Sequence, residues 1–251
     1  MKATVMITGA SSGFGAACAR RFAADGHRLV LLARREQRLQ ELAEALAGQA
    51  ELHLLAGDVR DGTLIAGLPA SLPADFREID ILINNAGLAL GQKAAHQASL
   101  DDWETMVDTN IKGLMRLTRA ILPSMVERDR GHIINVGSSA ASWPYPGGNA
   151  YGGTKAFVQQ FSRGLKADLA GTRLRVSCIE PGMAETEFSL TRFKGDNVAA
   201  DRVYAGTEPM SAEDVAEAIH WCARMPAHVN INAIELMPVC QAWGGWHVSR
   251  S

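Results

Sequence analysis

The sequence contains no apolar segment long enough to cross a membrane. Its longest apolar runs have the length of a β-strand, as at residues 28–33, whereas a membrane-spanning helix needs about 20 apolar residues. The first residues, MKATVMITGASSGFG, pass at once from a short apolar run into glycine and serine, which is not the pattern of a signal peptide. We therefore expect neither a membrane partner nor a targeting segment.

An excess of charge of one sign is also missing. The 25 lysines and arginines nearly balance the 27 aspartates and glutamates, and the formal net charge is −2. Without a basic block or patch there is no electrostatic case for binding nucleic acid or an anionic membrane surface. No repeat or low-complexity tract is present, which argues against a repeat array. We expect a small-molecule partner and no nucleic acid.

Cysteine pairs and metal-ligand patterns are absent. The four cysteines, Cys18, Cys178, Cys222 and Cys240, are far apart, and no CxxC occurs. Such cysteines are expected to be small buried hydrophobic residues in the reducing cytoplasm. The seven histidines are equally dispersed, so no metal site is expected.

What the sequence does contain is a regular alternation of strand-like and helix-like segments. Its 251 residues, 47% of them hydrophobic, can bury one large core. The strand-like runs are continuously apolar, which is typical of a parallel sheet covered by helices on both faces. We predict an α/β fold over residues 1–251: a single doubly wound (Rossmann-type) domain with a parallel sheet of about seven strands. The expected strands are residues 3–7, 28–33, 51–58, 79–87, 132–139, 173–182 and 232–238; the expected helices are residues 13–26, 36–47, 101–128, 150–169 and one starting with a capping box at Ser211 and Asp214.

A glycine-rich turn, TGASSGFG at residues 8–15, joins the first strand to the first helix. Glycine allows close backbone approach, and a helix N-terminus offers free N–H groups and partial positive charge to a pyrophosphate. The spacing differs from the common GxGxxG fingerprint, but the position predicts dinucleotide binding. The expected contacts are Gly9, Ser11, Ser12, Gly13, Phe14 and Gly15.

The second strand ends at Ala33-Arg34-Arg35, where an NAD-binding protein would carry an acidic residue. Two guanidinium groups suit a 2′-phosphate by charge and by forked hydrogen bonding. Arg34 and Arg35 therefore predict NADP(H) as the cofactor. The alternative is a solvated basic start of the next helix.

Two further segments follow strand ends. Asp58 and Val59 suit an adenine edge, and the run NNAG, with Asn85, Ala86 and Gly87, suits the adenine ribose. The alternative for both segments is ordinary turn chemistry, since Asn, Asp and Gly favour turns.

Tyr151 and Lys155 lie four residues apart in the run YGGTK, and Ser138 precedes the tyrosine by thirteen residues. On a helix, positions i and i+4 share a face. An ammonium group favours the phenolate and lowers the tyrosine pKa from about 10, and a shift to neutrality needs roughly 4 kcal/mol. Lys155 and the positive charge of an oxidised nicotinamide could supply this. The alternative is an ordinary amphipathic helix with a half-buried tyrosine.

With TGASSGFG, NNAG, Asn110, Ser138, YGGTK and Pro181-Gly182 in order, the sequence resembles the short-chain dehydrogenase/reductase superfamily over essentially its whole length. The resemblance implies that Tyr151 is the acid/base and that Ser138 binds the substrate oxygen. Lys155 would lower the tyrosine pKa and hold the nicotinamide ribose, and Asn110 would anchor a water of a proton relay. Further cofactor contacts are expected from Tyr151, Lys155, Pro181, Gly182 and Thr186.

Four segments, residues 84–91, 98–110, 141–162 and 226–239, narrow this resemblance to the NADP-dependent 3-hydroxy acid dehydrogenases. That group includes serine/allo-threonine dehydrogenases that also reduce malonic semialdehyde. The resemblance implies hydride transfer between NADP(H) and a small 3-hydroxy acid such as serine, allo-threonine or 3-hydroxypropionate. It also implies a cytoplasmic homotetramer. One departure is the run MAETEFS after Gly182, about a residue shorter than the pattern of the group, which leaves the identity of the substrate open.

Residues 183–210 are the expected substrate loop. A substrate carboxylate needs a cation, and this loop offers Arg192 and Lys194. We expect Arg192 to bind substrate together with Ser138 and Tyr151; the alternative is surface charge on a mobile loop.

Two other functions stay open. One is an NADPH-dependent carbonyl reductase for neutral ketones or aldehydes, which would use the same catalytic residues. The other is a non-catalytic NADPH-binding protein on this fold, which would be expected to lose part of the catalytic set that this chain retains.

Overall fold

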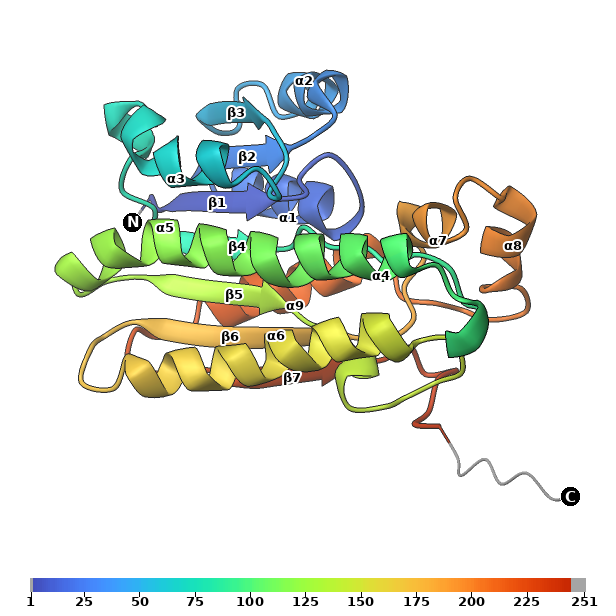
Figure 1. The fold of residues 1–251 in the computed structure, drawn as a ribbon. Coiled ribbons are helices and arrows are strands. Elements are labelled where there is room, and N and C mark those ends of the chain that lie inside the picture. The colour runs from blue at the N-terminus through green and yellow to red at the C-terminus, as the bar shows by residue number, and fades with distance from the viewer. Residues whose placement is uncertain (1, 245–251) are drawn as a thin grey trace, which may run out of the picture.

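A seven-stranded parallel sheet forms the centre of residues 2–244, the part of the chain that this computed structural model describes. Its strands are β1 (Thr4–Thr8), β2 (Arg28–Ala33), β3 (Leu52–Ala56), β4 (Ile81–Asn84), β5 (His132–Val136), β6 (Arg175–Pro181) and β7 (Ala233–Leu236). They lie in the order β3-β2-β1-β4-β5-β6-β7, and every neighbouring pair is parallel. The direction of the crossovers reverses between β1 and β4 (Figure 1). In open α/β sheets, ligands bind beyond the carboxyl ends of the strands at this switch point.

Helices cover both faces of the sheet. They are α1 (Gly13–Ala24), α2 (Glu36–Ala45), α3 (Gly62–Ser71), α4 (Leu100–Val107), α5 (Leu114–Glu127), α6 (Asn149–Asp168), α7 (Glu187–Arg192), α8 (Asn197–Arg202) and α9 (Ala212–Ala223), with short turns η1 (Ala74–Phe76), η2 (Ala95–Gln97), η3 (Asp108–Gly113) and η4 (Ser139–Ala141). Helices α1, α2 and α9 pack into one apolar cluster, and α3, α5 and α6 pack into the other. Figure 1 shows α5 and α6 in front of the sheet and α1 and α9 behind it.

Alternate residues of the central strands supply these two clusters. Val5 and Ile7 face the first cluster, and Met6 between them faces the second; all three are fully buried. Because both faces of the centre of the sheet are buried, the central strands are mainly apolar, and each such side chain stabilises the fold by about 1.5–3 kcal/mol. The prediction of a doubly wound fold is confirmed. Residues 1 and 245–251 of the predicted domain lie outside the described residues.

The predicted helix over residues 101–128 has the correct extent but is not uniform. A π-helical turn, η3, separates α4 from α5. Helix α3 was not predicted, because its sequence GTLIAGLPAS contains glycines and an internal Pro69. The capping box at the start of α9 is confirmed: Ser211 Oγ accepts from the Asp214 N–H at 3.1 Å, and Asp214 accepts from the Ser211 N–H at 2.8 Å.

The prediction that all four cysteines are buried is wrong for one of them. Cys18, Cys178 and Cys222 are buried free thiols, whereas Cys240 is exposed. Across residues 2–244, no three His, Cys, Asp or Glu side chains are close enough together to hold a metal ion. Within the same range, no helix has both the length and the apolar character needed to span a bilayer.

Candidate active site

A cavity of about 640 Å³ opens beyond the carboxyl ends of the strands. Most residues predicted from the sequence line it: Gly9, Ser11, Ser12, Gly13, Phe14, Arg34, Arg35, Asp58, Val59, Asn85, Ala86, Gly87, Ser138, Tyr151, Lys155, Pro181, Gly182, Thr186 and Arg192. Gly15 and Asn110 do not belong to its wall. The cavity therefore extends from the glycine-rich turn to the serine–tyrosine–lysine group.

Other residues that line the cavity belong to no sequence motif. Among them are Leu32, Gly137, Met183, Phe188, Tyr204, Met237, Gln241 and Trp243. Several come from the C-terminal segment after β7, where the Gln241 side-chain oxygen accepts from the Met183 N–H at 2.6 Å. Such contacts join residues far apart in the chain, so local patterns could not reveal them. Trp143, Pro144 and Tyr145, from the segment between β5 and α6, also line the cavity.

The glycine-rich turn between β1 and α1 requires its glycines. Gly9 and Gly13 have φ angles of 64° and 50°, in the left-handed region that favours glycine. At Gly15, an added Cβ would lie 2.3 Å from the Gly9 carbonyl oxygen and 2.7 Å from Asn85 Nδ2. Gly15 thus lies outside the cavity wall, and its lack of a side chain lets α1 begin directly against the end of β1.

The N-terminus of α1 is suited to an anion. Ser12 stands at the N-cap, but its side chain accepts no hydrogen bond from the first turn of the helix. The N–H groups of that turn carry partial positive charge, and Ser12 and Gly13 line the cavity. The residues present therefore fit the pyrophosphate of a dinucleotide.

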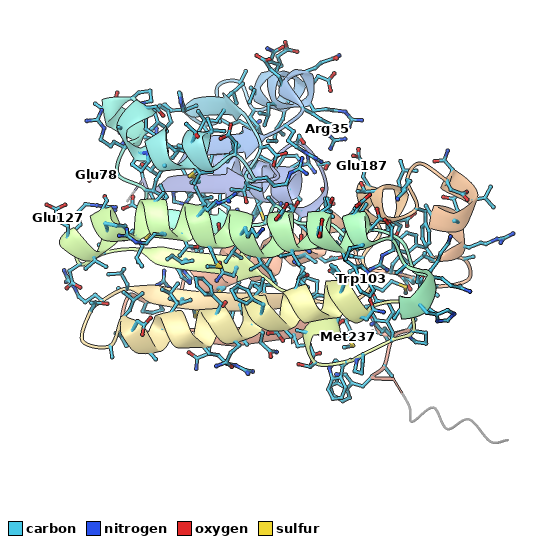
Figure 2. The ribbon with its side chains drawn as sticks, in the orientation of Figure 1. Arg35, Glu78, Trp103, Glu127, Glu187 and Met237 are labelled. Carbon is cyan, nitrogen blue, oxygen red and sulfur yellow. The ribbon has the colours of Figure 1, made fainter. Side chains whose placement is uncertain are left out.

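The two arginines after β2 differ in their contacts. Arg35 donates from Nη1 to Glu187 Oε2 at 2.8 Å and from Nε to Ser11 Oγ at 3.3 Å, and Figure 2 shows Arg35 and Glu187 on facing segments. Arg34 lines the same cavity and, among residues 2–244, forms no ion pair. Arg34 is therefore the guanidinium more available to a 2′-phosphate.

Asp58 and Asn85 are engaged by the protein itself. Both carboxylate oxygens of Asp58 accept from Arg60, which binds through its backbone N–H and its guanidinium. Asn85 Nδ2 donates to the Thr8 carbonyl at 2.8 Å, and Thr8 Oγ1 accepts from the backbone N–H groups of Asn85 and Ala86. The NNAG segment thus joins the ends of β1 and β4 and shapes the cavity wall.

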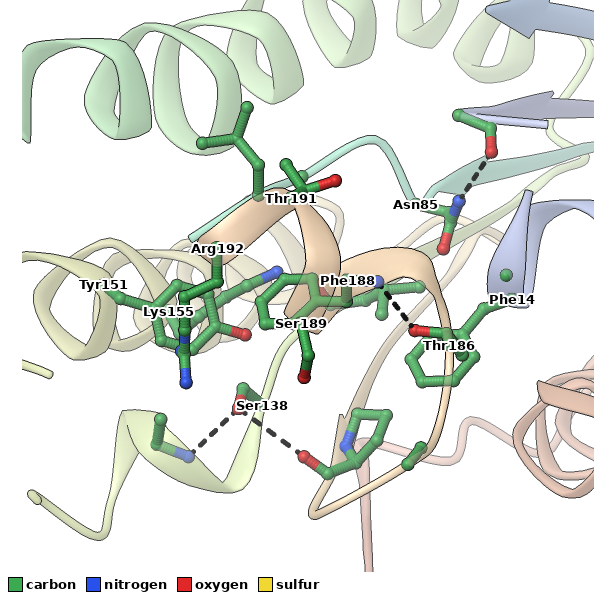
Figure 3. Close-up of a pocket in the computed structure, with 18 of the residues that line it drawn as sticks. Phe14, Asn85, Ser138, Tyr151, Lys155, Thr186, Phe188, Ser189, Thr191 and Arg192 are labelled. Carbon is green, nitrogen blue, oxygen red and sulfur yellow. Dashed lines mark hydrogen bonds between the residues drawn. The ribbon is translucent and has the colours of Figure 1, made fainter. Parts of the chain in front are cut away.

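Ser138, Tyr151 and Lys155 meet at the other end of the cavity (Figure 3). Ser138 follows β5, and its Oγ accepts from the Ala140 N–H at 3.1 Å. Tyr151 lies in the first turn of α6, and Lys155 lies one turn later, with Nζ 5.9 Å from the centroid of the tyrosine ring. The Lys155 ammonium donates to the Val136 carbonyl at 2.8 Å.

The electrostatics of this group differ from the expectation based on spacing. Burial raises the pKa of Tyr151 to about 12, against opposing effects of a hydrogen bond with Ser138 and the positive charge of Arg192. Burial also lowers the pKa of Lys155 to about 8. In the protein by itself, burial therefore outweighs the groups that lower the tyrosine pKa. Tyr151 stays protonated at neutral pH, the form that donates a proton to a carbonyl oxygen.

Asn110 lies in the π-helical turn η3, a kind of turn frequent at functional sites. Its Oδ1 accepts from the Leu88 N–H at 2.9 Å, and its Nδ2 donates to the Leu88 carbonyl at 2.8 Å and to Thr154 Oγ1 at 3.0 Å. Thr154 in turn donates to the Tyr151 carbonyl. The Asn110 side chain therefore fixes the first turn of α6, and its role in a water relay stays a prediction.

Arg192, the last residue of α7, lies beside the serine–tyrosine–lysine group. Its guanidinium carbon is 5.3 Å from the ring centroids of both Tyr151 and Phe188, and Nη2 donates to Tyr145 Oη at 2.7 Å. Its buried Nε has no hydrogen-bond partner among the described residues. Lys194, the other candidate cation, instead binds Asp102 at 2.8 Å and is not part of the cavity wall. Because a buried donor without an acceptor is unfavourable, the unpartnered Nε of Arg192 favours an anionic ligand.

The close approach at Gly15 leads to a testable prediction. In Gly15→Ala, the new Cβ would meet backbone atoms that cannot move freely, so we expect a loss of about 1–3 kcal/mol in the free energy of unfolding and weaker NADPH binding. Gly164→Ala is the matched control, since Gly164 lies inside α6 and a Cβ there meets nothing within 4 Å. Denaturant unfolding and NADPH fluorescence titration measure both effects. Equal stability and affinity in the two variants would contradict the role of Gly15.

The doubly wound sheet, the glycine-rich turn at its switch point and the serine–tyrosine–lysine group together define a dinucleotide-binding protein with an acid/base centre beside the binding cavity. The chain belongs to the short chain dehydrogenase family, whose model matches residues 3–197. The family resemblance found in the sequence is thereby confirmed.

Relatives match nearly the full length of the chain. The NADP-dependent 3-hydroxy acid dehydrogenase of Salmonella typhi is 55% identical over 248 residues, covering 98% of this chain and 99% of the relative. Sulfoacetaldehyde reductase 2 of Chromohalobacter salexigens is 52% identical over 251 residues and covers 100% of both chains. A solved structure of the closed form of serine dehydrogenase complexed with NADP+ is 54% identical, with a TM-score of 0.95 over 99% of this chain and 100% of that one.

Proposed function

We propose that this chain is an oxidoreductase that transfers a hydride between NADP(H) and a small 3-hydroxy acid. The observation that carries the choice of an acid is Arg192, a guanidinium with a buried, unpartnered Nε beside Tyr151. The relatives support it, since their names include an NADP-dependent 3-hydroxy acid dehydrogenase and a serine dehydrogenase. The reductase of a sulfonated aldehyde among them also acts on a small anionic compound.

NADP(H), when bound, accepts or supplies the hydride. The residues that would hold it are the glycine-rich turn for the pyrophosphate, Arg34 for the 2′-phosphate, and Tyr151 and Lys155 for the nicotinamide ribose. Asp58, Val59 and the NNAG segment would line the adenosine end. The individual cofactor contacts predicted from the sequence all line one cavity except Gly15, which lies against the Gly9 carbonyl outside the wall.

The protein groups around the reacting carbon handle the proton and the negative charge. During reduction, Tyr151 donates its phenolic proton to the substrate oxygen; during oxidation, the phenolate accepts the hydroxyl proton. The Ser138 hydroxyl donates to the oxygen, which gains negative charge as the carbonyl is reduced. Arg192 binds the substrate carboxylate and so places the reacting carbon next to Tyr151.

Residues 183–210 form the proposed substrate-covering segment, with α7 and α8 at its centre. Thr186, Phe188 and Arg192 from this segment line the cavity. The Phe188 ring lies 5.6 Å from the Tyr151 ring, centroid to centroid. Such a closed segment excludes water from the reacting groups.

A substrate panel tests the proposal. Purified enzyme is assayed at the NADPH absorbance band with L-serine, L-allo-threonine, 3-hydroxypropionate, 3-hydroxyisobutyrate and a neutral secondary alcohol; in the reverse direction it receives malonic semialdehyde, sulfoacetaldehyde and a neutral ketone. Turnover confined to anionic substrates supports the proposal. Turnover confined to the neutral pair would instead make this chain a general carbonyl reductase.

Arg34 is expected to determine the preference of the enzyme for NADPH over NADH. In Arg34→Ala, we expect KM for NADPH to rise at least about tenfold, since charge-assisted hydrogen bonds contribute about 1.5–3 kcal/mol, while KM for NADH stays nearly unchanged. Arg35→Ala is the comparison, because Arg35 is already bound to Glu187; its effect on NADPH should be smaller. Initial rates with both cofactors measure this. Equal effects of Arg34→Ala on NADPH and NADH would refute the assignment.

We also propose that the chain acts as a homotetramer in the cytoplasm. The support is the family resemblance, together with the outward faces of α4 and α5, where Leu100, Met115 and Val126 are exposed apolar residues. Sedimentation velocity measures the oligomeric state directly.

A further inference from the structure

Glu187, the first residue of α7, joins two segments that are far apart in the chain. One carboxylate oxygen accepts from Arg35 Nη1 at 2.8 Å, and the other accepts from Arg38 Nη1 at 3.0 Å. Figure 2 shows this approach between α2 and α7. The hydrogen bond from Arg35 lowers the pKa of Glu187, so the carboxylate is ionised throughout the neutral range.

Helix α7 connects this carboxylate to the catalytic group. It contains six residues, from Glu187 to Arg192, and its ends are about 7.5 Å apart at 1.5 Å per residue. The first end is tied to the arginines beside the glycine-rich turn, and the last carries the guanidinium that lies against the Tyr151 ring. Because the helix has fewer than two turns, we expect a shift at Glu187 to displace Arg192.

The other contacts of α7 lie at its middle and at its last residue: Ser189 Oγ hydrogen-bonds Tyr204 Oη at 2.6 Å, and Arg192 Nη2 donates to Tyr145 Oη at 2.7 Å. The Arg192 carbonyl accepts from the Gly91 N–H at 2.9 Å, and Lys194 binds Asp102 just beyond the helix. Both contacts secure the Arg192 end. At the Glu187 end, the ion pairs with Arg35 and Arg38 are the contacts that reach α2.

We propose that Glu187 is a positioning residue: by binding Arg35 and Arg38 it locks α7 over the cavity and holds Arg192 beside Tyr151. Recognition of the substrate anion then depends on a carboxylate that does not touch the substrate. This inference rests on the proposed function, since it takes Arg192 as the residue that binds the substrate anion.

Kinetics of Glu187→Gln test the inference. The amide keeps the size of the side chain and removes its charge. Because each half-exposed ion pair contributes up to about 1 kcal/mol, we expect KM for the anionic substrate to rise about fivefold, with a smaller effect on a neutral ketone and an NADPH Kd within about twofold of the parent. Arg38→Gln removes one of the two pairs from a residue outside the cavity wall and should raise the same KM by a smaller factor. In the double variant the two effects should be less than additive.

Glu213→Gln is the matched control. It breaks an exposed 2.7 Å ion pair with Arg20, between α1 and α9, and should leave all kinetic constants unchanged. Glu187→Asp, which keeps the charge, should recover part of the lost affinity. An unchanged KM for the anionic substrate in Glu187→Gln would overturn the inference. So would an NADPH Kd lowered more than about threefold, because Glu187 would then restrain cofactor binding.

Hydrogen exchange with NADPH bound and no substrate provides a readout independent of turnover. Residues 187–194 should exchange faster in Glu187→Gln than in the parent or in Glu213→Gln. If residues 187–194 exchange as slowly in Glu187→Gln as in the parent, Glu187 does not lock α7, even if the enzyme turns over hydroxy acids. Conversely, if the parent enzyme turns over no anionic substrate, the proposed function fails while the exchange experiment still tests the lock.

Discussion

Tyr151→Phe is expected to lower turnover about 1000-fold, within the range that a positioned general acid or base contributes. The substitution removes only the hydroxyl that we propose exchanges a proton with the substrate oxygen. The ring stays, with its contacts to Phe188 and to the Arg192 guanidinium, so the cavity keeps its shape. NADPH affinity should therefore change little. Stopped-flow single-turnover rates and NADPH fluorescence titration separate the two quantities.

Tyr145→Phe is the control for this experiment. Tyr145 Oη also lies in the cavity wall and accepts from Arg192, but it takes no part in the proposed proton transfer. Loss of that single hydrogen bond should cost about tenfold or less in kcat/KM for an acid. If Tyr151→Phe retained a tenth or more of the parental turnover, the tyrosine would not be the acid/base.

Arg192→Gln should separate acids from neutral substrates. Truncating one partner of a buried charge pair costs about 2–5 kcal/mol, so kcat/KM for an anionic substrate should fall at least about 30-fold. A neutral ketone makes no such pair, and its kcat/KM should fall only a few fold. Steady-state kinetics on one acid and one neutral ketone of similar size measure the difference.

Lys194→Gln controls for the general loss of a cation from the same segment. Lys194 binds Asp102 and lies outside the cavity wall, so both substrates should be affected alike and weakly. Equal losses on acid and ketone in Arg192→Gln would remove the case for anion recognition. The neutral carbonyl reductase would then be the better description.

The parts of this structure that could be predicted from sequence are those that depend on neighbours in the chain. Strand β1 is a continuous apolar run because Met6 faces one cluster while Val5 and Ile7 face the other. The turn after β1 needs glycine for its backbone angles, and Tyr151 and Lys155 share a face of α6 because of helical geometry. Each of these signals comes from a short stretch of residues.

What could not be predicted depends on the packing of distant segments. The bond between Arg35 and Glu187 joins residues 152 positions apart, and no local pattern distinguishes it from two solvated charges. The pKa of Tyr151 in the protein by itself depends on packing in the same way. Spacing shows that an ammonium is near, but the size of the burial effect that raises this pKa depends on the whole surrounding fold. Likewise, only the structure shows that Arg35 is paired with Glu187, which leaves Arg34 as the guanidinium available to a 2′-phosphate.

The strand-end side of the cavity and the side formed by helix α7 are held by different kinds of contact. The buried Thr8 side chain joins the ends of β1 and β4 by accepting hydrogen bonds from two backbone N–H groups, whereas helix α7 is held at its first residue by partly exposed ion pairs. Salt screens exposed charges far more than buried hydrogen bonds. High ionic strength should therefore loosen helix α7 before it affects the junction of β1 and β4. Ionic strength would then act on the substrate-covering segment without altering the glycine-rich turn.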